Sequence, residues 1–202
     1  MSKYSVQDTA ELFSTLMQSR QTTLPKRLIS PGPDPQQLKR ILESAASAPD
    51  HGQLLPWRFV IIPDATRPAL GTAFAEALLE RDASALPEQV QQAREKALRA
   101  PLLMLVVVRD KSGDTNIDFA ERVLSAGCAV QNMLVMATAL GFGTALTSGK
   151  ALKSVKLRSL FSLGTDDHAI CFVSIGTVGR NKQTRVRPLP EHYVSTLLPD
   201  AS

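Results

Sequence analysis

The feature that most constrains the fold of this chain is an unbroken apolar run from Leu102 to Val108, rich in leucine and valine. The run is far shorter than the roughly 20 residues that a membrane-spanning helix needs, and its valine content favours a strand. A strand that is apolar at every position must be covered on both faces. The run therefore predicts a buried, central strand over residues 102–109.

Amphipathic helices and shorter apolar strands surround this run. The clearest helix start is at Asp34, a good N-cap residue followed by Pro35 at the first helical position, and this helix ends before Pro49. The order of elements lacks regular strand–helix–strand repeats, which indicates an α+β fold with a central mixed or antiparallel sheet flanked by helices. Further helices are expected over residues 6–18, 65–81, 87–99, 117–140 and 154–161, and further strands over 57–62 and 169–176.

The helix over residues 117–140 is apolar on most of its faces, so we expect it to be buried or shared with another subunit. Gly141-Phe142-Gly143 ends it. These glycines are not a dinucleotide-binding fingerprint, because a helix precedes them and Leu146 stands where the third glycine is required. Phosphate-loop, zinc-protease and GxSxG motifs are absent from the sequence, so an enzyme of this sequence would need a bound cofactor.

The length of 202 residues fits one domain over residues 1–202, with a tail from about residue 180 that lacks regular periodicity. The N-terminus has no apolar signal segment, which favours a cytoplasmic protein. Cys128 and Cys171 fit small core residues better than a disulfide. Part of the net charge of +4 comes from a basic cluster in residues 180–187, which is either solvated surface or a site for an anionic partner.

A polar loop over residues 48–60 is the best candidate for a ligand site. It gathers an Asp, a His, a Gln and a Trp between a helix and a strand, and binding residues concentrate on loops carried by a rigid scaffold. Trp57 and Pro56 are better explained as anchors of the loop, since a Trp at a strand entrance usually buries its large face. His51 taken alone fits an ordinary loop histidine as well as a ligand contact.

The stretch Ala48-Pro-Asp-His-Gly-x-x-x-Pro-Trp-x-Phe59 resembles a loop of the flavin-dependent nitroreductases, especially the small NAD(P)H nitroreductases of the YdjA type. Three more stretches match that family in order, namely Ser19–Thr22, Ser125–Gly143 and Ile175–Thr177. The resemblance extends from about residue 12 to about residue 194. It implies the FMN-dependent nitroreductase fold, and a homodimer with FMN at the subunit interface and a C-terminal extension that reaches the partner.

The resemblance also implies residues that hold the FMN phosphate and ribityl chain. Arg20 matches the first cation of the family's Arg-Arg-Ser segment, although a cation that ends a helix explains it equally well on the sequence alone. Gln21 replaces the second Arg with an amide, and Thr22 keeps the expected hydroxyl. Arg185 and Arg187 match a C-terminal pair of cations that grips the phosphate, a role suited to guanidinium groups.

Two further segments match positions that contact the flavin. Ser47 and His51 correspond to residues that reach it from the neighbouring subunit. Leu146, Thr147 and Ser148 correspond to a segment that reads Trp-Arg-Ser in a close relative, so only the serine is retained. Loss of the Trp and the Arg changes the stacking surface and the charge near the flavin. The preference of the relative for NADH or NADPH therefore cannot be transferred to this chain.

The implied function is an FMN-dependent NAD(P)H oxidoreductase that passes hydride by a ping-pong mechanism to a nitroaromatic or quinone-like small molecule, without a nucleic-acid or membrane partner. No side chain is expected to act as a catalytic acid or nucleophile, because the cofactor carries the redox chemistry. Two alternatives stay open. One is a flavin-binding or redox-sensing module with little turnover, suggested by Leu146 and Thr147; the other is a polyanion-binding protein that uses the basic tail.

Overall fold

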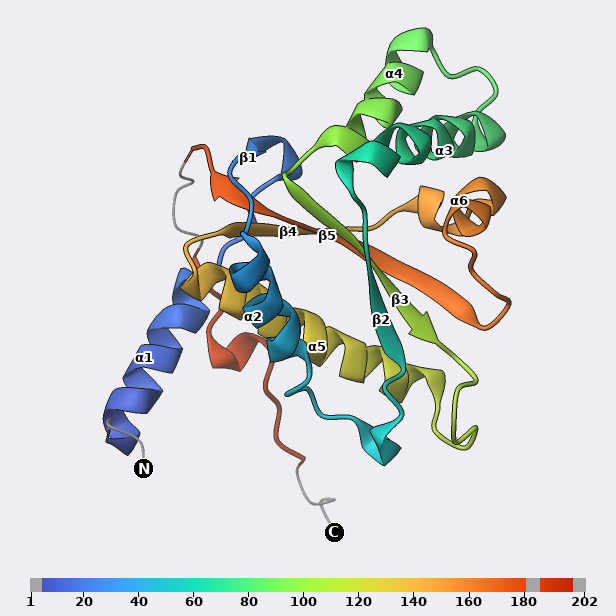
Figure 1. Cartoon of the computed structure of the whole chain (residues 1–202). Coiled ribbons are helices and arrows are strands. Elements are labelled where there is room, and N and C mark those ends of the chain that lie inside the picture. The colour runs from blue at the N-terminus through green and yellow to red at the C-terminus, as the bar shows by residue number, and fades with distance from the viewer. Residues whose placement is uncertain (1–4, 181–185, 198–202) are drawn as a thin grey trace.

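A five-stranded sheet forms the centre of the computed structural model, which describes residues 5–180 and 186–197. The expected α+β class, with a central sheet flanked by helices, is confirmed (Figure 1). Each pairing between the strands is antiparallel. The sheet follows the order β1 (Leu28–Ile29), β5 (Asp167–Val178), β3 (Leu102–Arg109) and β2 (Trp57–Ile61), and β4 (Gly143–Thr147) also pairs with β5.

β3 lies inside the sheet, between β2 and β5, as its apolar sequence predicts. Met104 and Val106 belong to one buried cluster, whereas Leu103, Leu105 and Val107 belong to a second cluster on the other face. This alternation follows from the two-residue period of a strand. One apolar run therefore supplies two cores.

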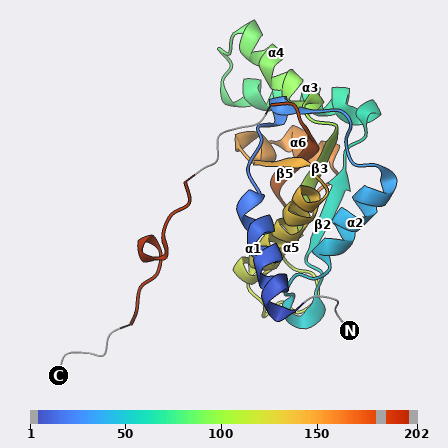
Figure 2. The same ribbon diagram turned by 90° about the vertical axis from the view of Figure 1, so that its left-hand side faces the viewer.

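Helices cover both faces of the sheet (Figures 1 and 2). α2 (Pro35–Ala45) and α5 (Phe119–Ala139) contribute to the first cluster and pack against each other. α3 (Arg67–Arg81) and α6 (Val155–Leu160) contribute to the second cluster on the opposite face. The two layers place α5 on one side of the sheet and the α3–α6 pair on the other.

The remaining helices pack on the outside of these layers. α1 (Val6–Ser19) contacts α5, and α4 (Pro87–Glu95) contacts α3. None of the residues of α1 is buried within the chain. Among the described residues, no helix has the length and apolar character that crossing a membrane requires.

Local sequence signals account for the start of α2. The N–H of Gln37 donates to the Asp34 carboxylate at 2.8 Å, and the N–H of Asp34 donates to the Gln37 side chain at 3.0 Å. Pro35 occupies the first helical position, where its missing N–H has no role in the helix. The predicted N-cap at Asp34 is confirmed.

β4 is the main element that the sequence analysis did not predict. Its first residue, Gly143, lies opposite Gly176 of β5. A Cβ on Gly143 would approach Val178 to 2.6 Å, and a Cβ on Gly176 would approach Pro101 to 2.5 Å. The strand therefore depends on close packing between segments that are far apart in the sequence, which a local pattern does not reveal.

Smaller differences concern the ends of elements. The helix expected over residues 87–99 ends at Glu95 and continues as a 3₁₀ turn over Lys96–Leu98. The helix expected from residue 65 begins at Arg67 after a 3₁₀ turn. β5 is longer than the predicted strand over 169–176.

The described part of the C-terminal tail, residues 186–197, projects away from the body of the chain (Figure 2). Its side chains are exposed, including Val186, Leu189 and Leu197. Within a single chain, the described part of the tail therefore does not pack along the body. Arg187 makes the hydrogen bonds that connect this part of the tail to the body.

Candidate functional site

The segment that follows α1 is fastened to the edge of β4. At Arg20 the backbone leaves the helix in an extended conformation, while its N–H still donates to the last turn at 3.1 Å. Thr22 forms a parallel bridge with Thr144 of β4, and the N–H of Thr23 donates to the Thr144 carbonyl at 2.8 Å. The candidate residues Arg20, Gln21 and Thr22 therefore lie beside β4.

The carboxyl end of β4 carries three more candidate residues. Thr144 is buried, whereas Leu146, Thr147 and Ser148 are exposed. Thr147 still pairs with β5, so the exposed end of the strand has a fixed backbone. The structure thus brings this segment together with the loop after α1, on a rigid support.

Gly149 lines a cavity beside the end of β4 and was not singled out by the sequence analysis. Its backbone has φ 153° and ψ 179°, a conformation that is open essentially to glycine alone. A Cβ at this position would meet nothing within 4 Å, so the backbone angle rather than crowding requires the glycine. The Ser148-Gly149 dipeptide is a turn signal and could have marked the position.

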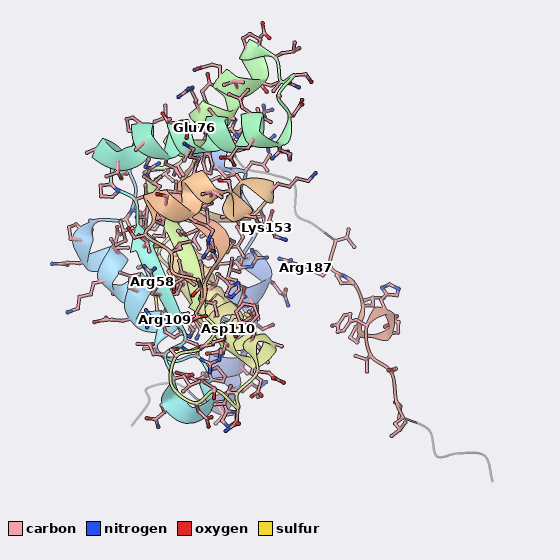
Figure 3. All side chains as sticks on the ribbon, turned by 90° about the vertical axis from the view of Figure 1, so that its right-hand side faces the viewer. Arg58, Glu76, Arg109, Asp110, Lys153 and Arg187 are labelled. Atoms are coloured by element: carbon pink, nitrogen blue, oxygen red, sulfur yellow. The ribbon has the colours of Figure 1, made fainter. Side chains whose placement is uncertain are left out.

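Arg187, in the described part of the tail, contacts the end of α1. Its Nη2 donates to the carbonyl of Arg20 at 2.7 Å and to that of Gln18 at 3.2 Å (Figure 3). The two arginines, 167 positions apart in the sequence, thereby meet at the end of α1. The other tail candidate, Arg185, lies outside the described residues.

The two arginines influence each other through their charges, and within the described residues neither forms a salt bridge. The pKa of Arg20 is lowered, first by its partial removal from water and second by the positive charge of Arg187. Within residues 5–180 and 186–197, no carboxylate forms a salt bridge with either arginine. A cation whose charged form is destabilised in this way gains from a bound anion, and guanidinium groups suit phosphate.

The other two candidates, Ser47 and His51, lie elsewhere. His51 Nδ1 is 2.9 Å from the Glu121 carboxylate of α5, and both side chains are at least half exposed. Ser47 lines a shallow groove of about 510 Å³ together with Leu124 and Cys128 of α5. In a single chain these residues do not join the group around Arg20.

The helix α5 separates the two groups. Glu121, the contact of His51, lies in its first turn, and β4 follows its other end. A helix of 21 residues is roughly 30 Å long at the usual rise per residue. This length exceeds that of an FMN molecule, so His51 and Arg20 of the same chain do not reach one flavin.

The loop that carries His51 is held firmly on the core. Pro56 is buried, and the indole N–H of Trp57 donates to the Ser125 hydroxyl at 3.1 Å. The Asp50 carboxylate accepts a hydrogen bond from the N–H of Leu55 at 2.7 Å. The predicted anchoring role of Pro56 and Trp57 is confirmed.

A cavity of about 650 Å³ opens beside the end of β4. Thr147, Ser148 and Gly149 line one side of it, and residues of α3 and α4 line another. This volume lies within the range of small-molecule sites. The carboxyl end of β4 therefore borders a cavity that can hold an organic molecule, whereas Arg20 lies near the start of the strand, because Thr22 pairs with Thr144 in parallel register.

Metal ligands and the buried thiol of Cys171 are two further candidates for chemistry in the described part of the chain. It contains no group of three or more His, Cys, Asp or Glu side chains that could hold a metal ion. Cys171 lies in the first core cluster, and burial raises the pKa of its thiol to about 11. A thiol with this pKa stays protonated at neutral pH and is a poor nucleophile.

The donor set fits the FMN expected from the sequence. Arg20 and Arg187 offer positive charge for a phosphate, and Thr22 and Ser148 offer hydroxyls for a ribityl chain. The fit rests on these cations, which have no salt-bridge partner within the described residues, and on the cavity beside the carboxyl end of β4.

Comparison with known proteins gives a consistent result. The profile described as "Nitroreductase family" matches residues 29–177. A Haemophilus influenzae protein named "Putative NAD(P)H nitroreductase" is 35% identical over 171 residues, which cover 85% of this chain and 90% of that protein. The Escherichia coli protein "Putative NAD(P)H nitroreductase YdjA" is 32% identical over 173 residues, covering 84% and 91% of the two chains.

Solved structures show the same fold at low sequence identity. A nitroreductase-like family protein from Bacillus cereus superimposes with a TM-score of 0.79 at 15% identity, covering 98% of each chain. A mutant of an FMN and NADPH-dependent nitroreductase from a Sphigopyxis strain gives a TM-score of 0.69 at 18% identity, covering 91% of this chain and 98% of the other.

Proposed function

This chain belongs to the nitroreductase family of oxidoreductases, and on that premise we propose that it is an FMN-dependent NAD(P)H oxidoreductase. When bound, FMN supplies the redox chemistry, by which hydride passes from NAD(P)H to a nitroaromatic or quinone-like acceptor in alternating, ping-pong half-reactions. No protein side chain needs to act as a nucleophile in such a transfer.

The observation that carries this proposal is the unpaired Arg20–Arg187 group at the end of α1. Arg187 approaches Arg20 closely enough to lower its pKa, and no described carboxylate compensates them. In the proposal these two side chains hold the FMN phosphate. Thr22 and Ser148 then orient the ribityl chain along β4, while the main chain at Gly149 leaves room beside the flavin.

We further propose that the working unit is a homodimer in which Ser47 and His51 of one subunit approach the flavin held by Arg20 of the other. The length of α5 supports this arrangement, because one chain does not bring both groups to one flavin. Exposed apolar side chains support it as well. Leu12 and Phe13 of α1 are 55% and 57% exposed, and Leu124 of α5 is 69% exposed, which is unfavourable unless a partner covers them.

The proposal is tested by the visible absorption spectrum of the purified full-length protein, recorded before and after addition of FMN. Anaerobic titrations with NADH and with NADPH follow in the same cuvette. A protein-bound flavin that bleaches with either donor supports the oxidoreductase. If the protein retains no flavin after reconstitution, the assignment of Arg20 and Arg187 and the proposed function both fail.

Mixed dimers test the sharing of each site between subunits. An Arg20→Gln chain and a His51→Gln chain, combined in one dimer, should give one site with both residues intact and one with both replaced. Flavin titration should then show two affinities, one of them equal to that of the unaltered protein. Two weakened sites, neither with the affinity of the unaltered protein, would mean that both residues serve the same flavin within one chain.

A second candidate is a flavin-binding sensor with little turnover. Leu146 is 46% exposed at the β4 end and, like Thr147, carries no charge that would attract a nicotinamide nucleotide. On this alternative the protein binds FMN, yet neither NADH nor NADPH bleaches it within minutes. The same titration therefore separates the two functions.

A further inference from the structure

The cavity beside β4 has a strongly basic wall that the proposed function does not use. Arg81, Lys96, Arg99 and Lys150 line this cavity, and its lining contains no Asp or Glu. We call these four residues the basic wall. A cavity lined by cations of one sign attracts anions, since its low-dielectric surroundings strengthen the field.

The basic wall is assembled from separate parts of the fold. Arg81 is the last residue of α3, and Lys96 begins the 3₁₀ turn after α4. Arg99 follows that turn, and Lys150 begins the turn after Gly149. Four positive charges from three regions of the sequence thus line one cavity. A row of cations on the surface of a single helix would not have this arrangement.

These four cations also lack ionic partners among the described residues. No carboxylate in residues 5–180 and 186–197 forms a salt bridge with any member of the basic wall. Neighbouring cations differ, because Lys156 pairs with Glu76 at 3.6 Å and Arg94 donates to the Thr72 hydroxyl at 3.0 Å. No salt bridge within the described residues therefore neutralises the basic wall.

The floor of the cavity is apolar. Phe74 and Leu78 of α3, Leu103 of β3 and Phe172 of β5 line it. The rings of Phe74 and Phe172 meet edge to face at a centroid distance of 5.5 Å. Such a floor accepts a flat ring, so the cavity as a whole suits a ligand that joins an aromatic ring to several negative charges.

FMN does not account for these charges. It has one phosphate, for which the Arg20–Arg187 pair is already available at the end of α1. The second substrate of the proposed reaction has more, since a nicotinamide dinucleotide carries a pyrophosphate and NADPH carries a further 2′-phosphate of about −1.5 to −2 charge. Four cations exceed the two negative charges of a pyrophosphate and leave positive charge for a third phosphate.

We propose that the basic wall binds the phosphate groups of the nicotinamide nucleotide and selects NADPH over NADH. The inference rests on the proposed function, which identifies the nucleotide as a substrate. Thr147 and Ser148 border both this cavity and the candidate flavin strand, so a nucleotide held here lies next to the flavin site. Arginine suits a phosphate with two parallel hydrogen bonds, and lysine adds a compact charge.

The test measures binding first and turnover second. Adenosine 2′,5′-bisphosphate and 5′-AMP are titrated by calorimetry into the FMN-loaded protein and into the double variant Lys96→Gln/Arg99→Gln. The matched control is Lys39→Gln/Arg40→Gln, which removes one lysine and one arginine from exposed positions of α2 on the opposite face of the sheet. Thermal unfolding of each variant checks that the fold is retained.

The bisphosphate should bind the unaltered protein more tightly than 5′-AMP. The Lys96→Gln/Arg99→Gln variant should lower bisphosphate affinity about tenfold or more, as expected for loss of charge-assisted contacts, and the control should not. The ratio of kcat/KM for NADPH to that for NADH should fall in parallel. These results together support the inference.

Three results would overturn it. The first is equal binding of the two fragments to the unaltered protein, and the second is an equal effect of the two double variants. The third is a variant that raises KM for 4-nitrobenzoate but not for NADPH, which would assign the basic wall to an anionic acceptor. Failure of the proposed function is seen separately as the absence of bound flavin, because fragment binding to the same protein can still be measured.

Discussion

Arginine side chains near the two ends of α5 have different surroundings. Near its start, Arg122 is 1% exposed and donates to the carbonyls of Ser112 at 2.7 Å and Ile117 at 3.1 Å, and also to that of Asp114. Beyond its other end, Arg20 is partly exposed and has another cation, Arg187, as its charged neighbour. Backbone carbonyls thus satisfy the Arg122 guanidinium, whereas the Arg20 guanidinium has no hydrogen-bond or salt-bridge partner within the described residues.

This difference separates a residue that stabilises the chain from residues that, in our proposal, bind a ligand. Backbone carbonyls satisfy the Arg122 guanidinium and at the same time hold the loop before α5 in one conformation. Around Arg20 the electrostatics are unfavourable without an anion. Stability should therefore respond to changes at the first end, and ligand affinity to changes at the second.

The largest effect is expected for Arg122→Met. The change leaves several loop carbonyls without a donor, so the free energy of unfolding should fall by about 3 kcal/mol, which lowers Tm by roughly 6–12 °C for a chain of this size. Differential scanning calorimetry of the apoprotein measures it. FMN affinity at a temperature where the variant is folded should not change, and a large loss of affinity there would break the comparison.

Replacement of Arg20 or Arg187 by Gln should show the reverse pattern. Each variant should weaken FMN binding about tenfold or more, because one charge-assisted contact to phosphate is lost, while Tm of the apoprotein stays within about 1 °C. Fluorescence titration with FMN measures the affinity. Arg40→Gln on α2 is the matched control. Unchanged affinity in both variants would remove these residues from the cofactor site.

A smaller effect is expected for Gly149→Ala. An alanine at φ 153° is strained, so the free energy of unfolding should fall by about 1 kcal/mol, with a modest loss of FMN affinity as Ser148 shifts. Gly164→Ala is the control, since a Cβ there also meets nothing within 4 Å but the backbone has no unfavourable φ. Equal melting curves for the two variants would show that the turn adapts to a side chain.

The smallest effect on stability is expected for His51→Gln. The pair with Glu121 is exposed and should contribute less than about 0.5 kcal/mol. FMN affinity of the dimer should nevertheless fall about threefold, because one hydrogen-bonding contact from the partner is altered. Glu121→Gln separates the two roles, since it breaks the pair and keeps the imidazole. If both variants change only stability, His51 belongs to the fold alone.

Much of the fold could be predicted from local patterns. The run over 102–109 is a central strand, and the helix expected over 117–140 is observed as α5. These elements follow from side-chain period and apolar content, which act within a few residues. β1 and β4 were missed because their pairing with β5 depends on distant glycines and on the close approach of other segments.

The sequence motifs predicted which residues form the candidate site. The structure shows which other residues lie beside them. Arg20, Thr22 and Ser148 could be selected from the sequence, yet their proximity depends on the bridge between Thr22 and Thr144. Gly149 and the basic wall were not selected, because single cations and a single glycine carry no signal until the fold places them around a cavity.

The sequence by itself determined the class of the protein, its central strand, the cap of α2 and the residues that mark the family, because short-range periodicity and motifs encode these properties. Only the tertiary structure decided that Arg187 reaches Arg20, that His51 lies a helix length away from them, and that four cations line one cavity. Charge in a protein acts through space, and the distances that set its effect exist only once the chain has folded.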